Sequence, residues 1–516
     1  MSTGSTASTT TLTFQVVTDL TICVLSPTDS LSTCELNPVI WHRIEKELYL
    51  HTSQQSAWLY VALANEDDLA AEDLLLVDIA IGEAPPHPSS DRSWESRPGG
   101  IWVLRSKFSG KIDNVVTEVD VLFGIDAIDP RPQWTLMRSP LELDVQPNVP
   151  VARLSLLHGR AKRRPDDRAG LRVREDGRFR IVQISDTHMV TGVGVCSDAI
   201  DAHGKDLPEG EADPLTVDFI EKILDIEKPD LVILAGDQLH HDISDSQSAL
   251  FKVVAPMIVR SIPFAAVFGN HDCEGTHALT RTAQMAILQK LPFSLCESGP
   301  QEVDGVGNFY LQILAAAPSQ CPLSTLYFLD SHGQIPSKTI HPDYHPITES
   351  QIDWFTNVSQ ARRRDREENT NSLYHLSLAF LHIPVPEFGD PRLNIRNGHR
   401  REPTEGPSFN SHFYDALVKE GISALGCGHD HVNDFCALLP QSPQDGNITP
   451  RPGPWLCYGG GSGFGGYCSY GKERFHRRMR IWEIDTTTGS LKTWKRVEYV
   501  VDRVDELVLV ENGVVV

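Results

Sequence analysis

The sequence predicts an α/β fold from residue 178 onward and a β-rich domain before it. Two patterns indicate this division. In the first part apolar and polar residues alternate along short segments, which is typical of strands with one buried face. In the second part short apolar strands alternate with amphipathic helices, which favours a mostly parallel sheet. The chain of 516 residues is long enough for roughly two to four domains. Its 40% hydrophobic and 22% charged residues are an ordinary globular composition.

The β-rich domain is expected over residues 13–145, after a disordered tail at 1–12. Three segments in it repeat an Asp followed by alternating apolar residues, and a strand led by an aromatic residue follows each. The repeated segments are TDLTICV (18–24), VDIAIG (77–82) and VDVLFG (119–124), and the following strands are WLYVAL (58–63), IWVLR (101–105) and WTLM (134–137). Three copies of a strand pair suggest a three-fold domain such as a β-prism. An irregular sandwich is the alternative.

Residues 146–177 contain Pro147, Pro150 and a basic run (Arg160, Lys162, Arg163, Arg164), and we predict that they form a linker. The predicted α/β domain covers 178–500, and residues 501–516 are expected to be a C-terminal extension. Its first elements are strands at 179–186, 231–237 and 263–270 and helices at 214–230 and 248–262. Each strand ends in a polar cluster. The carboxyl ends of parallel strands share one sheet edge, which is where open α/β sheets bind ligands.

Charge and cysteine content limit the possible partners. There are 46 basic and 69 acidic residues, and the net charge of −23 disfavours binding to nucleic acid or anionic lipid. An anionic substrate therefore needs a local reversal of charge, which bound metal ions supply. The ten cysteines form no CxxC pair and resemble neither a zinc ribbon nor a disulfide framework, which favours a reducing compartment. Without a signal peptide or a long apolar run, we expect an intracellular, cytoplasmic location and no membrane span.

Five clusters of Asp, Asn and His follow apolar, strand-like runs. They are SDTH (Asp186, His188), GDQ (Asp237), GNHD (Asn270, His271, Asp272), FLH (His382) and GHDH (His429, His431). A single buried His is most often structural, but core packing does not explain five such clusters. Mixed nitrogen and oxygen ligands suit Zn, Mn or Fe. Seven candidate ligands are too many for one tetrahedral site, and a carboxylate such as Asp237 can bridge two ions, so we expect two metals.

The residues after Asn270 suggest how a leaving group could be protonated. His271 follows a candidate ligand directly and could act as a general acid. Asp272 could accept a hydrogen bond from the other imidazole nitrogen and keep the ring protonated. These two residues are our candidate catalytic pair.

The ordered motifs DxH, GD, GNHD, H and GHxH resemble those of the calcineurin-like metallophosphoesterase superfamily. The resemblance implies a four-layer α/β/β/α sandwich with two metals held in loops, and hydrolysis by in-line attack of a metal-bound hydroxide. It also implies the ligands of each metal. By this analogy the first metal takes Asp186, His188, Asp237 and His431, and the second takes Asp237, Asn270, His382 and His429.

Longer strings, such as FGNHDCEG and YGGGSGFGGY, resemble the fungal DCR-type phosphatases and the plant short purple-acid-phosphatase-like proteins. The tyrosine that gives purple acid phosphatases a coloured ferric site is replaced by His240, so we expect no such colour. With Asn270, His240 is a candidate for substrate binding, and His241 and Glu387 could also touch phosphate or support the metals. The glycine-rich segment at 458–467 is either a tight passage from sheet to loop or a backbone wall beside the metals.

The resemblance predicts a phosphomonoesterase, plausibly acting on phosphoproteins. A phosphodiesterase of cyclic nucleotides or phospholipid headgroups is the second enzymatic hypothesis, because the same metal site can run both reactions. The third hypothesis is a scaffold with a vestigial site, in which the β-rich domain recruits a protein partner.

Overall fold

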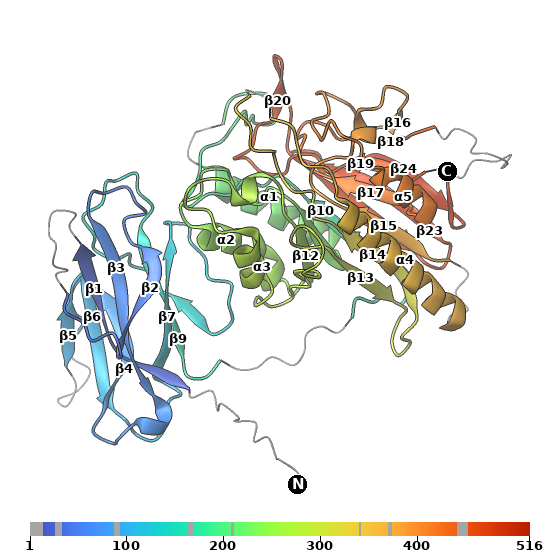
Figure 1. Ribbon diagram of the computed structural model, residues 1–516. Coiled ribbons are helices and arrows are strands. Elements are labelled where there is room, and N and C mark those ends of the chain that lie inside the picture. Colours follow the sequence, from blue (N-terminus) through green and yellow to red (C-terminus); the bar gives the residue numbers. More distant parts are fainter. Residues whose placement is uncertain are drawn as a thin grey trace, which may run out of the picture. The chain divides into compact units, whose positions relative to one another are not determined.

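The computed structural model describes residues 14–25, 34–86, 93–161, 170–207, 211–339, 342–369, 374–440 and 453–516. The chain divides into two compact units, Met1–Arg164 and Pro165–Val516 (Figure 1). The tail predicted at 1–12 lies outside the described residues. Among the described helices, none combines the length and apolar character that crossing a membrane requires.

The N-terminal unit contains three antiparallel sheets of three strands, and in each the last strand in sequence lies in the centre. The first sheet has the order β1 (Gln15–Leu25), β3 (Ser56–Asn65), β2 (Trp41–Glu47). The second has the order β4 (Leu74–Ile81), β6 (Ile101–Lys107), β5 (Trp94–Arg97), and the third β7 (Val116–Phe123), β9 (Ala152–His158), β8 (Trp134–Leu136). A 3₁₀ turn, η1 (Glu66–Asp68), follows β3.

The repeat is therefore real, but its unit is three strands, and the predicted strand pair was wrong in that respect. The predicted linker at 146–177 was also wrong over β9, which is the central strand of the third sheet and the counterpart of β3 and β6. The WTLM segment forms the edge strand β8 instead. One hydrophobic core draws on all three sheets, with Leu20, Ile79 and Val121 among its members. The β-prism itself stays a prediction.

The Asp that marks each repeat has a structural role. The side chain of Asp19, Asp78 or Asp120 accepts a hydrogen bond from the next backbone N–H at 2.8 Å. In β1 and β4 a register shift against the central strand directly precedes the Asp. These carboxylates therefore stabilise local backbone irregularities, which explains why the same residue recurs in a region without catalytic motifs.

The C-terminal unit contains two sheets of seven strands. The first sheet has the order β12-β11-β10-β22-β23-β24-β25. Its first three strands are mutually parallel: β10 (Arg178–Ile184), β11 (Leu231–Ala235) and β12 (Phe264–Val267). The other four strands continue the sheet in antiparallel pairs: β22 (Arg478–Asp485), β23 (Ser490–Val497), β24 (Val504–Glu511) and β25 (Val514–Val515). The strands β22 and β23 form a hairpin around the DTTTG segment (485–489). The predicted C-terminal extension was wrong, because β24 and β25 complete this sheet.

The second sheet has the order β13-β14-β15-β17-β19-β18-β16. Its strands are β13 (Phe309–Leu314), β14 (Pro322–Phe328), β15 (Leu376–Phe380), β16 (Asn394–Asn397), β17 (Ala424–Cys427), β18 (Cys436–Leu438) and β19 (Trp455–Tyr458). Helices α1 (Ala212–Glu227), α2 (Ser246–Val259) and α3 (Arg281–Leu288) accompany the first sheet, and α4 (Glu349–Asn369) and α5 (Phe413–Glu420) the second (Figure 1). A small hairpin, β20 (Ser469–Tyr470) and β21 (Glu473–Arg474), and two 3₁₀ turns, η2 (His271–Cys273) and η3 (Pro386–Gly389), complete the unit.

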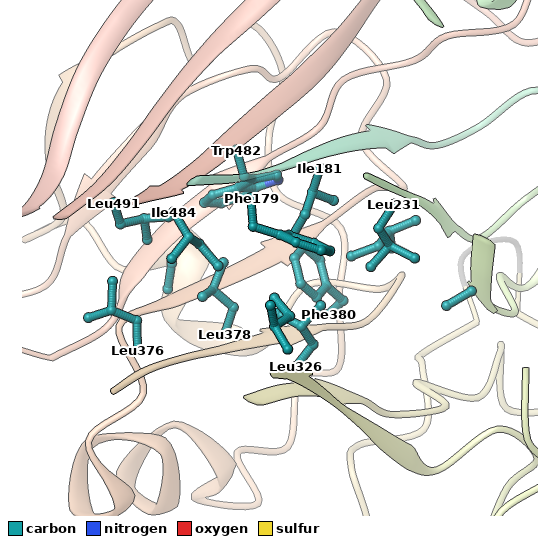
Figure 2. Close-up of a cluster of buried hydrophobic side chains, with 14 of the residues drawn as sticks. Phe179, Ile181, Leu231, Leu326, Leu376, Leu378, Phe380, Trp482, Ile484 and Leu491 are labelled. Carbon is teal, nitrogen blue, oxygen red and sulfur yellow. The ribbon is translucent and has the colours of Figure 1, made fainter. Parts of the chain in front are cut away.

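The largest core of this unit lies between the two sheets. Figure 2 shows Ile181 and Leu231 of the first sheet together with Leu378 and Phe380 of the second. Because side chains alternate along a strand, the next residues face the other way, and Ala379 packs with Phe355 of α4 and Leu417 of α5 in a separate core. The four-layer α/β/β/α sandwich is thereby confirmed.

Two disulfides correct the prediction drawn from the cysteine spacing. Cys23 is bonded to Cys34 in the N-terminal unit. Cys436 is bonded to Cys457 between the adjacent strands β18 and β19. The pairing of β18 with β19 brings Cys436 and Cys457 together, which their sequence spacing does not reveal.

Candidate metal centre

The five predicted clusters meet at the carboxyl ends of strands from both sheets. Asp186 and His188 follow β10, Asp237 follows β11 and Asn270 follows β12. His382 follows β15, and His429 and His431 follow β17, so the second sheet supplies only histidines. All seven residues are buried. Sequence alone placed each residue after a strand, but the packing of one sheet on the other joins the two sets.

Two groups of potential ligand atoms lie side by side. One consists of Asp186, His188 and His431, and the other of Asp237, His382 and His429; within each group the ligand atoms lie within 4.8 Å of one another. Asp237 connects the groups, because its Oδ2 lies 3.1 Å from His382 Nε2 and 3.8 Å from His188 Nε2. Six of the seven candidate ligands thus fall into two groups, and Asp237 lies near a histidine of each group. The division of the ligands between two metals and the bridging role of Asp237 stay predictions.

Several of these atoms are buried without a hydrogen-bond partner among the described residues. They include Oδ2 of Asp186, Oδ1 of Asn270 and Nε2 of His382 and His429. His188 Nε2 and His431 Nε2 face each other at 3.1 Å, although at most one can donate to the other. Burying unpaired polar atoms is costly, and cations coordinated by these atoms would remove that cost. The residues present therefore fit two metal ions.

The histidine rings are oriented by hydrogen bonds from their other nitrogen. His382 Nδ1 donates to the carbonyl of Ala235 at 2.9 Å, and His431 Nδ1 donates to the carbonyl of Tyr467 at 2.8 Å. Each bond leaves Nε2 free to coordinate a metal, which is the usual arrangement of metal-binding histidines. The ring of Tyr467 also stacks on His431, with centroids 4.0 Å apart.

Burial sets the protonation of the site before any cation binds. It lowers the pKa of His188 and His429 well below the usual value and that of His431 to about 3, so these imidazoles are neutral, as metal ligands must be. Burial opposes protonation of His382 too, but Asp237 raises the pKa of that ring to about 9. A cation between them would take the place of this proton.

The backbone around the centre is strained and crowded. Asp186, His188, Asp237 and His429 have positive φ angles between 47° and 78°, which are uncommon for residues other than glycine. A Cβ on Gly269 would lie 2.1 Å from Oδ1 of Asp237. The GD and GNHD motifs therefore need glycine beside the bridging carboxylate.

The glycine-rich segment at 458–467 is the backbone wall that was one of its two predicted interpretations. A Cβ on Gly466 would lie 2.5 Å from Cε1 of His431 and 2.7 Å from Cδ2 of His188. On Gly463 it would lie 1.9 Å from the carbonyl oxygen of Thr187. Only glycine allows the loop to pack this closely behind the ligands.

His271 lies at the site, but its predicted partner was wrong. Asp272 is fully buried and accepts hydrogen bonds from the backbone N–H groups of Asp237, Leu239 and Gly269, at 2.7–3.1 Å. The partner of His271 is instead Glu274, whose Oε2 accepts from Nδ1 at 2.6 Å. Sequence reasoning missed Glu274; the spacing of three residues across a 3₁₀ turn was the available signal, because residues i and i+3 share a side of such a turn.

The environment of His271 favours the protonated ring. Burial alone would lower its pKa, but the carboxylates of Asp237 and Glu274 raise it to about 9. Its side chain is 32% exposed, so the ring is reachable from solvent. The remaining nitrogen, Nε2, is therefore available to give a proton to a bound group.

The three other rim candidates are His240, His241 and Glu387. The ring of His241 lies beside that of His240, with centroids 4.1 Å apart. The ring of His240 lies beside His188, with the Nδ1 atoms 3.4 Å apart, and its half-buried position allows contact with a bound group. Glu387 is hydrogen-bonded to Asn410 and contacts none of the seven candidate ligands in the interactions described. Its predicted role next to the metals is therefore unsupported.

Comparisons with known proteins agree with this geometry. A family model for calcineurin-like phosphoesterases matches residues 179–433. Phosphatase DCR2 of Saccharomyces cerevisiae is 36% identical over 429 residues, which are 80% of this chain and 68% of that protein. Probable inactive purple acid phosphatase 29 of Arabidopsis thaliana is 35% identical over 64% of this chain and 85% of its own length. A solved dimetal phosphatase from Danio rerio aligns with a TM-score of 0.41 and 12% identity, over 64% of this chain and 99% of that one.

Proposed function

The chain belongs to the calcineurin-like phosphoesterase family, and from this premise we propose that it is a phosphomonoesterase that uses two metal ions and acts on phosphoproteins. The observation that carries the proposal is the pair of buried ligand groups joined by Asp237, with ligand atoms left unpartnered in the described residues. Such an arrangement has a high energetic cost unless cations occupy it.

The proposed ligands are those that the motif order implies. Asp186, His188, Asp237 and His431 would hold one ion, and Asp237, Asn270, His382 and His429 the other. When bound, two such ions polarise a phosphate ester and activate water. The chain's own contribution is to hold four imidazoles and two carboxylates in fixed orientations. Three of the imidazoles are neutral, and His382 would lose its proton when a cation binds. The glycine-rich loop closes the back of the site.

His271 is the proposed general acid. Its Nδ1 is held by Glu274, which fixes the ring and leaves Nε2 as the only nitrogen that can donate to the departing oxygen of the substrate. A serine alkoxide is a poor leaving group and needs this proton. His240, beside His188, is placed to contact the phosphate or the leaving group. Asp272 has a different role in this proposal, which is to fix the loops that carry Asp237 and Asn270.

Two observations bear on the competing hypotheses. The Arabidopsis relative is named as probably inactive, which is compatible with a scaffold. In this chain, however, every predicted ligand position is occupied by a residue that can bind metal and that is buried at the centre. We therefore favour an active enzyme. The choice between monoester and diester rests on the resemblance to phosphatases alone.

Two measurements on the purified full-length chain test the proposal. Elemental analysis should find two metal ions per chain, drawn from Zn, Mn and Fe. The visible absorption spectrum of the same sample should show no charge-transfer band. With these metals bound, an aryl phosphate monoester should be hydrolysed faster than a diester with the same leaving group. A preference for the diester would favour the phosphodiesterase hypothesis. Two bound metals without hydrolysis of either ester would favour the scaffold.

A further inference from the structure

A second cavity lies in the C-terminal unit, beside η3 and the start of α5. It has a volume of about 590 Å³, and its lining includes Glu387, Asp390, Arg392, Asn410, His412 and Asp415. None of the seven candidate metal ligands belongs to this lining as the structure describes it. The cavity is therefore distinct from the metal centre, and its walls are mainly charged or polar.

Glu387 is the unusual member of this lining. The residue is only 9% exposed, and its Oε1 accepts a hydrogen bond from Asn410 Nδ2 at 2.6 Å. Its Oε2 is buried and has no hydrogen-bond partner among the described residues. A buried carboxylate with one neutral partner is incompletely satisfied, so the site lacks a donor.

The other charges in the cavity are already paired. Arg392 donates to Asp390 through two nitrogens, at 2.7 and 3.1 Å. His412 Nδ1 lies 2.9 Å from Asp415 Oδ2. Among the described lining residues, neither Arg392 nor His412 forms an ion pair with Glu387. Burial raises the pKa of Glu387, although Asn410 and His412 act in the opposite direction, and a cation bound beside this carboxyl group would favour its charged form.

The cavity wall is also part of the support of the metal centre. Thr404 and Gly406 line the cavity, and Glu405 between them accepts a hydrogen bond from Tyr344 at 3.5 Å. The ring of Tyr344 packs edge-on against His429, with centroids 5.0 Å apart. Tyr344 and the loop that carries Glu405 thus connect the cavity wall to a proposed ligand. Three or four residues of extended peptide span roughly 10–14 Å, so the test places arginine within four residues of the phosphoserine.

We propose that this cavity binds the guanidinium or ammonium group of a basic side chain in a phosphoprotein substrate, a few residues from the phosphorylated one, with Glu387 as its partner. This inference rests on the proposed function and names a substrate feature that the metal centre alone does not select. The chain as a whole is acidic, and its net charge of −23 attracts basic peptides. This agrees with a basic side chain as the group that binds in the cavity.

The test uses phosphoserine peptides in which one arginine is moved through the four positions on each side of the phosphoserine. For the metal-loaded full chain, we expect the best position to raise kcat/KM at least about tenfold over the all-alanine peptide, mainly through KM. Glu387→Gln should abolish this preference and leave hydrolysis of an aryl phosphate unchanged. Glu367→Gln, a change of the same kind at an exposed position of α4, is the matched control and should keep the preference.

Two results would overturn the inference. One is equal kcat/KM for all peptides in the wild-type chain, and the other is a preference that survives in Glu387→Gln. In case this variant does not fold, argininamide provides a second measurement. It should compete with the arginine peptide and not with the aryl phosphate. Activation of aryl phosphate hydrolysis by argininamide would instead show an effector site and reject the substrate assignment.

Fluorescence anisotropy of labelled versions of the same peptides separates the two proposals, because it needs no turnover. If the aryl phosphate is not hydrolysed but arginine still strengthens binding through Glu387, the proposed function fails and the cavity assignment stands. If the aryl phosphate is hydrolysed and arginine affects neither binding nor kcat/KM, the cavity assignment alone fails.

Discussion

Asp19 and Asp120, in strands of the N-terminal unit, are paired with arginines, whereas Asp186 and Asp237, which follow strands in the C-terminal unit, face histidines. Asp19 Oδ2 lies 2.7 Å from Arg97 Nη2, and Asp120 Oδ2 lies 2.9 Å from Arg131 Nη1. At the metal centre, Asp186 has one oxygen without a partner among the described residues. Aspartate thus has an arginine as its counter-ion in one unit, and in the other unit it has a carboxylate oxygen without a partner among the described residues. The unpartnered oxygen indicates where a cation would bind.

The largest effect that this contrast predicts is that of Asp237→Asn. A neutral amide bridges two cations poorly, so we expect loss of metal from the protein and loss of nearly all activity, beyond the roughly 10–100-fold typical of residues that only support a ligand. Metal content by elemental analysis and turnover of an aryl phosphate would check this. Asp19→Asn is the matched control; it should keep both metals and full activity. Retention of two metals and near-native turnover in Asp237→Asn would reject the bimetallic assignment.

The next effect concerns His271→Ala, which should keep both metals. We expect a loss of roughly 10²–10⁴-fold on an alkyl phosphate, because the alkoxide then leaves without a proton. Nitrophenolate leaves without help, so the loss on an aryl ester should be distinctly smaller. Equal losses on both substrates, with intact folding and metal content, would assign His271 to phosphate binding instead.

Glu274 and Asp272 should differ from each other in the same assay. Glu274→Gln weakens the hydrogen bond to His271 and should show a smaller version of the same dependence on the leaving group. Asp272→Asn disturbs three backbone contacts of the ligand-bearing loops. It should lower thermal stability and metal affinity, with equal loss on both substrates. If Asp272→Asn showed the dependence on the leaving group and Glu274→Gln showed equal losses on both substrates, Asp272 would be the partner of His271.

A paired aspartate inside the C-terminal unit sharpens the comparison. Asp434 is buried and contacts Arg478, Arg401 and Lys495 at 2.6–2.8 Å. Asp434→Asn leaves these buried cations unbalanced and should lower the free energy of unfolding by about 3–5 kcal/mol. Chemical denaturation in the presence of a chelator would measure it, and metal content in a parallel sample without chelator should be unchanged.

The same variant has a defined pH signature. Burial alone would raise the pKa of Asp434, but the three cations hold it well below the usual range. A lowered pKa stabilises the fold above the unfolded value of about 3.9, and the contribution is lost as pH falls through the folded value. The stability difference between wild type and Asp434→Asn should therefore be largest near neutral pH and shrink below about pH 4. A difference that grows in acid would contradict the ion-pair explanation.

The smallest effect is expected from removing the N-terminal unit. A chain that starts at Gly170 keeps every proposed ligand, and it keeps Leu171 and Val173, which pack in the core between the sheets. We expect unchanged turnover of an aryl phosphate if the shortened chain folds, as circular dichroism would show. Loss of metals from a folded truncation would mean that residues before 170 complete the site.

Much of the centre could be predicted from the sequence, because its motifs are local. Asp237 follows the continuous apolar run LVILA, and Asp186 follows the largely apolar segment IVQIS; such segments form buried parallel strands whose ends share an edge. By contrast, β9 (ARLSLLH) lies between prolines and a basic run, which is the composition of a linker, so the sequence did not indicate that it is the central strand of the third sheet. The residues of β24 were likewise predicted to be an extension, because the pairing of β24 with β23 forms only in the folded sheet.

The sequence by itself determined the chemical type and order of the ligands and the strands that carry them, because residue identity and periodicity are local properties. Only the tertiary structure decided which atoms meet. The packing of the two sheets brings His382, His429 and His431 to the aspartates of the first sheet. The 3₁₀ turn at His271–Cys273 places Glu274 on the same side as His271, and Asp272, one residue along, turns toward the backbone of the neighbouring loops. The partner of a side chain depends on the direction in which each backbone turn points it, which composition and spacing do not encode.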